Sequence, residues 1–181
     1  MKKAKPLAFC AVMLALAMIL SYIESLIPLP VPLPGVKLGL ANTAVLFVML
    51  YLSPEYAAVI SLLRVLLSAL LFGNITGFIL SLCGAALSFA VMLLLAKCRI
   101  FSAIGISIGG AAAHSTAQVL AASLLMGNAS VIYYLSFLLL CSTVTGAIGG
   151  TVVLLLQKRL GSGLLSVRKQ AALEEQQQKS R

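Results

Sequence analysis

Apolar residues occur in long runs along the chain, separated by short polar or turn-forming segments. The runs are about 20 residues long, the length that an α-helix needs to cross roughly 30 Å of hydrocarbon. They lack the alternation of polar and apolar residues that marks the strands of a membrane β-barrel. The pattern predicts an all-α integral membrane protein, a bundle of six transmembrane helices over residues 6–27, 38–52, 54–72, 75–96, 104–126 and 131–157.

The breaks between these runs carry residues that start or end helices. Pro54 suits the first turn of a helix, where its missing N–H costs no hydrogen bond. The pairs Gly73–Asn74 and Gly127–Asn128 favour turns, and the basic segment 97–99 ends another run. We expect one transmembrane domain over residues 1–160 and a polar tail over 161–181 that is mobile or lies at the cytoplasmic membrane surface.

Composition and charge placement support this prediction. Hydrophobic residues make up 61% of the chain and charged residues 9%, whereas about a quarter of a soluble domain is charged. The net charge of +9 comes from basic residues that flank the apolar runs, which argues against nucleic-acid binding. No C-x-x-C pair occurs, so we expect no metal and no cofactor.

The same basic residues predict the topology, because cytoplasmic loops of bacterial membrane proteins collect Lys and Arg. With six spans and both termini in the cytoplasm, the basic residues at both ends and those of segment 97–99 all lie on the cytoplasmic side. Only Lys37 then falls outside, and Arg64 falls within a span. Residues 1–25 resemble a signal peptide, but the apolar run continues to Ile27, so we expect this segment to remain as the first span of a bacterial cytoplasmic membrane protein.

Polar side chains within the apolar runs or at their ends are the best candidates for a binding site, because ionisable groups are costly inside a bilayer. The predicted topology brings six of them to the outer half of the bundle. Two interpretations are open for Arg64 in the third run. It pairs with Glu24 of the first run only to make its burial tolerable, or it belongs to a ligand site. The six candidates are Glu24, Lys37, Asn42, Arg64, His114 and Gln118.

The segment between the first two helices is unusual in composition. Its four prolines, spaced two residues apart over 28–34, favour an extended chain, and Gly35 permits a turn. Lys37 adds a cation, and the following sequence GLAN is predicted to open the second helix with free N–H groups. This arrangement suits an anionic or strongly polar ligand, although a simple connection between helices remains an alternative.

The first helix carries a different feature, Ala11 and Ala15, four residues apart. Small residues at this spacing allow close approach of another helix. The pair is therefore a candidate docking face, with the general abundance of alanine in membrane helices as the alternative explanation.

The sequences YIESLIPLPVP (22–32) and PGVKLGLAN (34–42), followed by a span with Arg64, carry a family resemblance. Over residues 6–157 the chain resembles the family labelled both heptaprenyl diphosphate synthase component I and Gx transporter. That family is in turn similar to the substrate-binding S components of energy-coupling factor (ECF) transporters. The resemblance implies an outward-facing pocket closed partly by the segment between the first two helices. It also implies that AVMLA (11–15) engages a transmembrane coupling subunit, with energy supplied by separate ATPase subunits.

Chemistry argues against the enzyme that the family label names. Joining prenyl diphosphates requires Mg²⁺ held by acidic residues, but the chain has no aspartate and only four dispersed glutamates. It also lacks a G-x-x-x-x-G-K-[ST] phosphate loop. We therefore expect a nonenzymatic substrate-binding subunit for a small polar or anionic metabolite. The alternative is a noncatalytic membrane subunit of isoprenoid or quinone metabolism.

Overall fold

The computed structural model describes the backbone of residues 4–26 and 37–179, and side chains within 6–26, 37–71 and 73–159. These described residues form helices joined by short connections and contain no strand. The helices are α1 (Ala4–Leu26), α2 (Asn42–Tyr51), α3 (Pro54–Phe72), α4 (Ile75–Cys98), α5 (Ala103–Met126), the 3₁₀ helix η1 (Ala129–Tyr133) and α6 (Tyr134–Lys179).

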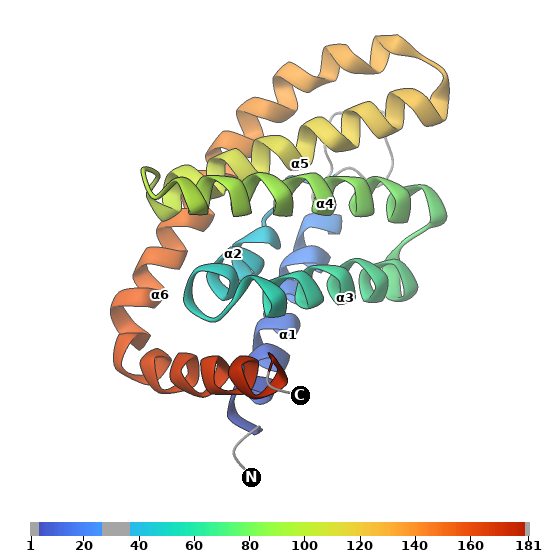
Figure 1. Ribbon diagram of the computed structural model, residues 1–181. Coiled ribbons are helices and arrows are strands. Elements are labelled where there is room, and N and C mark those ends of the chain that lie inside the picture. Colours follow the sequence, from blue (N-terminus) through green and yellow to red (C-terminus); the bar gives the residue numbers. More distant parts are fainter. Residues whose placement is uncertain (1–3, 27–36, 180–181) are drawn as a thin grey trace.

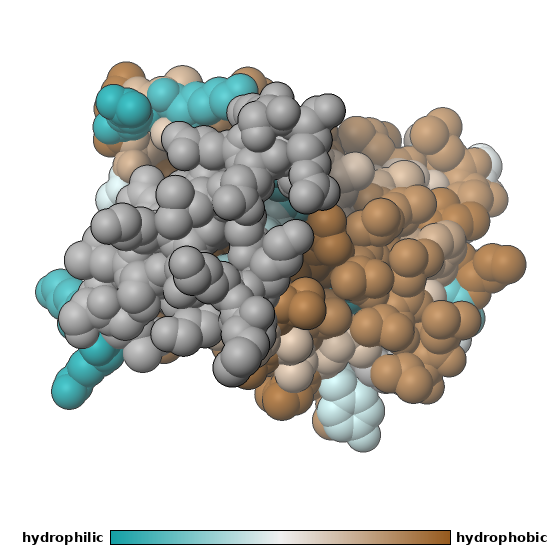
Figure 2. All heavy atoms as spheres, turned by 60° about the horizontal axis from the view of Figure 1, so that its bottom comes forward, coloured by the Kyte–Doolittle hydropathy of each residue, from teal (hydrophilic) through white to brown (hydrophobic). Residues whose placement is uncertain are grey.

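Four of these helices are long and apolar enough to cross a membrane: Pro6–Leu26, Pro54–Leu71, Ile75–Cys98 and Ala129–Arg159. Large apolar side chains on them face outward, such as Leu70 with 82% of its surface exposed. Figure 2 shows apolar residues over most of the right-hand part of the face in view. Because such a surface is unfavourable in water and favourable in lipid, the chain is a membrane protein.

The other two helices predicted to cross the membrane differ from these four. α2 has 10 residues and spans only about 15 Å, half of the hydrocarbon thickness. α5 has 24 residues, but polar side chains including His114 and Gln118 lower its apolar content. An all-helical membrane protein is thus confirmed, with four helices that are long and apolar enough to cross.

Local chemistry explains where the helices begin and end. Pro54 occupies the first turn of α3, and the Asn74 side chain accepts a hydrogen bond from the Gly77 N–H at 2.7 Å at the start of α4. Gly127 ends α5 with a positive φ of 60°. The predicted breaks between helices at Gly73–Asn74 and Gly127–Asn128 are confirmed, with a turn at Gly127 and extended backbone at Gly73 and Asn74.

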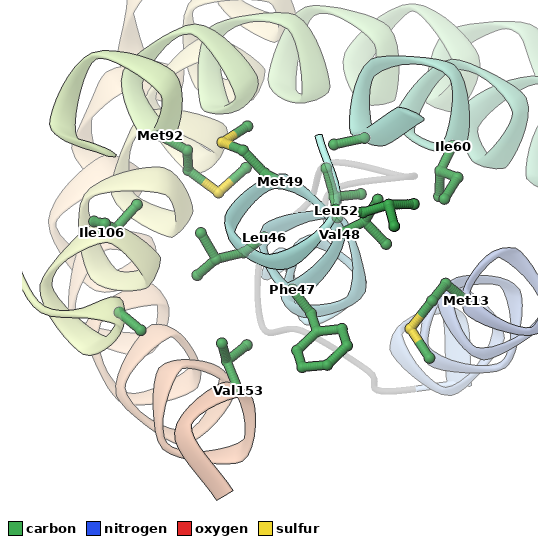
Figure 3. Close-up of a cluster of buried hydrophobic side chains, with 13 residues drawn as sticks. Met13, Leu46, Phe47, Val48, Met49, Leu52, Ile60, Met92, Ile106 and Val153 are labelled. Atoms are coloured by element: carbon green, nitrogen blue, oxygen red, sulfur yellow. The ribbon is translucent and has the colours of Figure 1, made fainter. Parts of the chain in front are cut away.

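The helix α2 is the centre of the structure. It contacts each of the other five α-helices, and seven of its ten residues are buried. Figure 3 shows its apolar side chains surrounded by Met13 of α1, Ile60 of α3, Met92 of α4, Ile106 of α5 and Val153 of α6. A short helix can occupy this place because every side of it faces protein.

α2 begins later than the sequence predicted. The expected start was Leu38, but residues 37–41 form a non-helical segment and the helix begins at Asn42. Gly39 has a φ of +87°, a conformation incompatible with a continuing α-helix and favoured by glycine. We call residues 37–41 the entry segment.

The remaining helices pack in a layered order. In Figure 1, α4 lies between α3 and α5, and α6 runs back along α5. Two glycines permit close approach of α6 to α5: a β-carbon on Gly146 would lie 2.8 Å from Ile108 Cα, and one on Gly150 would collide with Ile104 Cα. Tight backbone packing of these helices therefore depends on glycine at both positions.

The backbone of α6 continues as a helix to Lys179, through the segment expected to be a tail. In Figure 1 this last part turns sharply away from the preceding part of α6 and runs across the bottom of the view. The mobile or interfacial character of residues 161–181 stays a prediction.

We predict that Phe47→Ala lowers the free energy of unfolding by about 3 kcal/mol or more, because it opens a cavity beside the central helix. Phe47 is 1% exposed, whereas Phe137 on α6 is 41% exposed. Phe137→Ala is therefore the matched control, with an expected smaller effect. Thermal unfolding of both variants in the same detergent measures the difference, and equal losses would contradict the central role of α2.

Candidate functional site

Buried polar side chains gather around the start of α2. Arg64 of α3 and His114 of α5 are each 1% exposed, Gln118 of α5 is fully buried, and Glu24 of α1 is 4% exposed. Asn42, the first residue of α2, is 5% exposed. Since buried ionisable groups are rare without a structural or functional reason, this cluster is the candidate functional site.

The entry segment holds the cluster together through its backbone. The Lys37 N–H donates to Gln118 Oε1 at 3.0 Å, and the Leu40 N–H donates to Glu24 Oε1 at 2.6 Å. The Thr145 hydroxyl of α6 also lies 3.4 Å from the Leu38 carbonyl oxygen, but the carbonyls of Cys141 and Ser142 in its own helix are nearer acceptors. The expectation that GLAN (39–42) presents free N–H groups is therefore wrong for Leu40 and Asn42, because Glu24 Oε1 accepts the first bond and the Gly39 carbonyl accepts the second.

Arg64 connects three helices through hydrogen bonds to neutral groups. Its Nη2 donates to Asn42 Oδ1 at 3.3 Å, and its Nη1 donates to Ser21 Oγ at 3.4 Å. Asn42 Nδ2 in turn donates to Ser88 Oγ of α4 at 3.0 Å. No direct hydrogen bond joins Arg64 to Glu24 within the described residues, so these two side chains interact there through their charges alone.

Ser21 and Ser88 are the polar partners that sequence reasoning missed. Serine is common in membrane helices, so neither stands out by type. Ser21 lies three residues before Glu24 and shares its helix face, which was the one available signal. Ser88 carries no comparable signal, because its partner Asn42 lies 46 residues away in the sequence.

Two glycines leave space around His114. A β-carbon on Gly84 of α4 would lie 2.7 Å from His114 Cε1 and 3.0 Å from Gln118 Cγ. A β-carbon on Gly39 would lie 3.7 Å from His114 Cδ2 and 3.2 Å from Asn42 Nδ2. The imidazole is thus packed between the entry segment and α4, where a side chain at Gly84 would displace it.

Several buried polar atoms of the cluster make no hydrogen bond within the described part of the chain. They include Glu24 Oε2, Arg64 Nε, Gln118 Nε2 and both ring nitrogens of His114. A buried polar atom without a partner costs about 1–3 kcal/mol, and more if it is charged. Four side chains from three helices therefore carry unused hydrogen-bonding capacity in one region.

Lys37 lies at the edge of this cluster and is partly buried. Burial lowers the pKa of its ammonium group, the Arg64 charge lowers it further, and the Glu24 carboxylate opposes both. Lys37 therefore holds its proton less strongly than an exposed lysine does. When Lys37, Arg64 and Glu24 are all ionised, the site carries a net positive charge.

Ala11 and Ala15 lie elsewhere, on the outer surface of α1. Both are exposed, while Met13 and Ala17 on the opposite side are buried. Ala15 precedes Glu24 by nine residues, a rise of about 13 Å along the helix. The two alanines thus form a separate surface that is free of contacts with the polar cluster.

The described residues contain no group of three or more His, Cys, Asp or Glu side chains that could hold a metal ion. The four cysteines are free thiols. The polar cluster offers hydrogen bonding and charge, supplied by the six residues that the sequence singled out and by Ser21 and Ser88.

Comparison with known proteins gives one result. The family model described as heptaprenyl diphosphate synthase component I matches residues 13–156, which include α2 to α5 and all of the candidate site. No curated protein and no solved structure matches the chain. Since the match covers well over half of its 181 residues, the chain belongs to the heptaprenyl diphosphate synthase component I family.

Proposed function

We propose that this protein is a substrate-binding subunit of an ECF-type uptake transporter, which captures a small polar or anionic metabolite. The observation that carries this proposal is the set of buried polar atoms without partners on Glu24, Arg64, His114 and Gln118. A ligand that paired with these atoms would recover the cost of their burial.

A purely structural role accounts less well for the cluster. Breaking a buried polar network is destabilising, but replacing one with well-packed apolar residues is often neutral or stabilising. Helix packing alone therefore does not require Arg64, His114 and Gln118 in the interior of a membrane protein. Their incomplete pairing argues for a partner that is bound only part of the time.

The proposed topology has six membrane segments, with α2 as a short central one and α5 as a polar one. Neighbouring helices, rather than lipid, surround much of both, so a short helix and a polar helix can lie at membrane depth. With both termini in the cytoplasm of a bacterial cell, the polar cluster lies towards the outer side. The metabolite enters there and is released inside when the bundle reorients.

The subunit is proposed to recognise the ligand but not to supply energy or catalysis. Ala11 and Ala15 form the contact with a transmembrane coupling subunit, and separate ATPase subunits hydrolyse ATP. The exposure of both alanines on α1 supports this assignment, since a contact face must be accessible.

A second candidate follows from the family's name, which describes a synthase component. In that case the protein is a noncatalytic membrane partner that presents a prenyl chain or quinone precursor to an enzyme. The absence of aspartate and the placement of Glu174 and Glu175 near the C-terminus speak against its carrying the catalytic Mg²⁺ site itself.

Mass spectrometry of small molecules that co-purify with the protein tests the choice between these functions. The transport proposal predicts a water-soluble metabolite released on denaturation and missing from an Arg64→Gln preparation. Glu55→Gln, an exposed substitution outside the cluster, is the control. A prenyl lipid or quinone as the only bound molecule would favour the second candidate.

The coupling face has its own prediction. Replacing Ala11 and Ala15 with leucine adds bulk to a close helix contact and should abolish co-purification with the coupling subunit, while ligand binding stays within about twofold of wild type. Ala86 and Ala90 of α4 are also exposed and four residues apart, so their double leucine variant is a matched control. Loss of the complex in the control alone would move the contact to α4.

A third prediction concerns Lys37. Lys37→Ala should weaken binding of an anionic ligand by up to about fivefold, because a partly exposed charge contributes at most about 1 kcal/mol. The loss should shrink as salt is raised, since ions screen the ammonium. Titrations at low and high salt measure this, with the exposed Lys97→Ala as control; unchanged affinity at low salt would remove Lys37 from the site.

A further inference from the structure

Two opposite charges are buried in the site, and both are incompletely paired. Glu24 accepts a hydrogen bond at Oε1 from the Leu40 N–H, but its Oε2 has no partner in the described part of the chain. Arg64 donates from Nη1 and Nη2 to the side chains of Ser21 and Asn42, but its Nε has none there. The bonds that these two residues make go only to neutral groups.

The open atoms specify what a ligand must present. Glu24 Oε2 needs a hydrogen-bond donor and favours a positive one, while Arg64 Nε needs an acceptor and favours a negative one. Gln118 Nε2 adds a second place for an acceptor. Neutral His114 has one nitrogen that donates and one that accepts, so it fits either end of such a molecule.

We infer that the ligand is a small zwitterion of the amino-acid type, with its carboxylate at Arg64 and Gln118 and its ammonium at Glu24. This inference rests on the proposed function, because it names the substrate class of the same site. A zwitterion offers each buried charge an opposite partner and brings no net charge into the bundle.

Other ligand classes leave part of the site unsatisfied. A simple anion would pair with Arg64 but leave Glu24 Oε2 without a donor beside it. A diphosphate would also bring two or more negative charges close to the Glu24 carboxylate, where the repulsion is strong at low dielectric constant. A simple cation would leave Arg64 Nε without an acceptor.

The size of the ligand is limited by the groups that surround these atoms. His114 and Gln118 lie four residues apart on one face of α5 and pack against Gly84 of α4, with Gly39 of the entry segment on the other side. This tight packing favours a compact molecule over a long prenyl chain.

Thermal shift measurements with matched pools of compounds test the inference on the purified wild-type protein. The probes are the twenty protein amino acids, the same amino acids with acetylated amines, the same amino acids as carboxamides, and inorganic diphosphate. We expect only the unmodified amino acids to raise the melting temperature, by several degrees. Equal stabilisation by the acetylated pool or by diphosphate, or no stabilisation by any pool, would overturn the inference.

A variant adds a test that a structural role would not satisfy. Glu24→Gln keeps the shape and an oxygen for the Leu40 N–H but removes the negative charge. It should weaken binding of the stabilising amino acid by about tenfold and reduce the preference for the free amine over its acetylated form. Glu55→Gln should change neither property, and an unaltered preference in Glu24→Gln would overturn the assignment of the ammonium to Glu24.

The outcomes separate this inference from the proposed function. If a co-purified water-soluble metabolite lacks an ammonium or a carboxylate group, the zwitterion is wrong and the transport function stands. If the protein retains only a prenyl lipid or quinone, both are wrong.

Discussion

The burial of the Arg64 guanidinium is the constraint on which the arrangement of this protein depends. A charged group in an apolar bundle must find hydrogen-bond acceptors within the protein, because lipid offers none. Arg64 finds them on Ser21 of α1 and Asn42 of α2, and Asn42 bonds onward to Ser88 of α4. One side chain thus fixes the relative positions of four helices near the start of α2.

Because Arg64 must be hydrogen-bonded inside the bundle, the first residue of α2 differs in its environment from the rest of the helix. Its first residue belongs to the polar network, whereas the residues from Ala44 to Met49 are apolar and buried, in a helix that contacts the other five α-helices. Any displacement of Asn42 is therefore transmitted to the packing that Figure 3 shows around Phe47 and Leu46. The polar site and the apolar core meet in a single ten-residue helix.

Much of the helical architecture could be predicted from the sequence, because lengths of apolar runs and turn residues are local signals. The ends at Pro54, Asn74 and Gly127 are examples. The gathering of Glu24, Asn42, Arg64, His114 and Gln118 could also be anticipated, since each is a polar residue in an apolar run.

The details of the site could not be predicted, because they depend on contacts between distant segments. The positive φ of Gly39 sets the start of α2, and the bonds of Lys37 and Leu40 to α5 and α1 use backbone groups that no side-chain pattern reveals. Ser88 becomes a partner only when α4 packs beside α2. The six-segment count, the orientation and the role of the site remain predictions of the charge pattern and the family resemblance.

The hydrogen bond from the Leu40 N–H to Glu24 has a thermodynamic consequence of its own. The entry segment already occupies one oxygen of the carboxylate with a donor that belongs to the protein. Any incoming molecule that takes this oxygen competes with an internal rival whose effective concentration is fixed by the chain connecting α1 to α2. The affinity of such a molecule is reduced by the cost of displacing the Leu40 N–H, and a substitution that loosens the entry segment can tighten its binding without touching it.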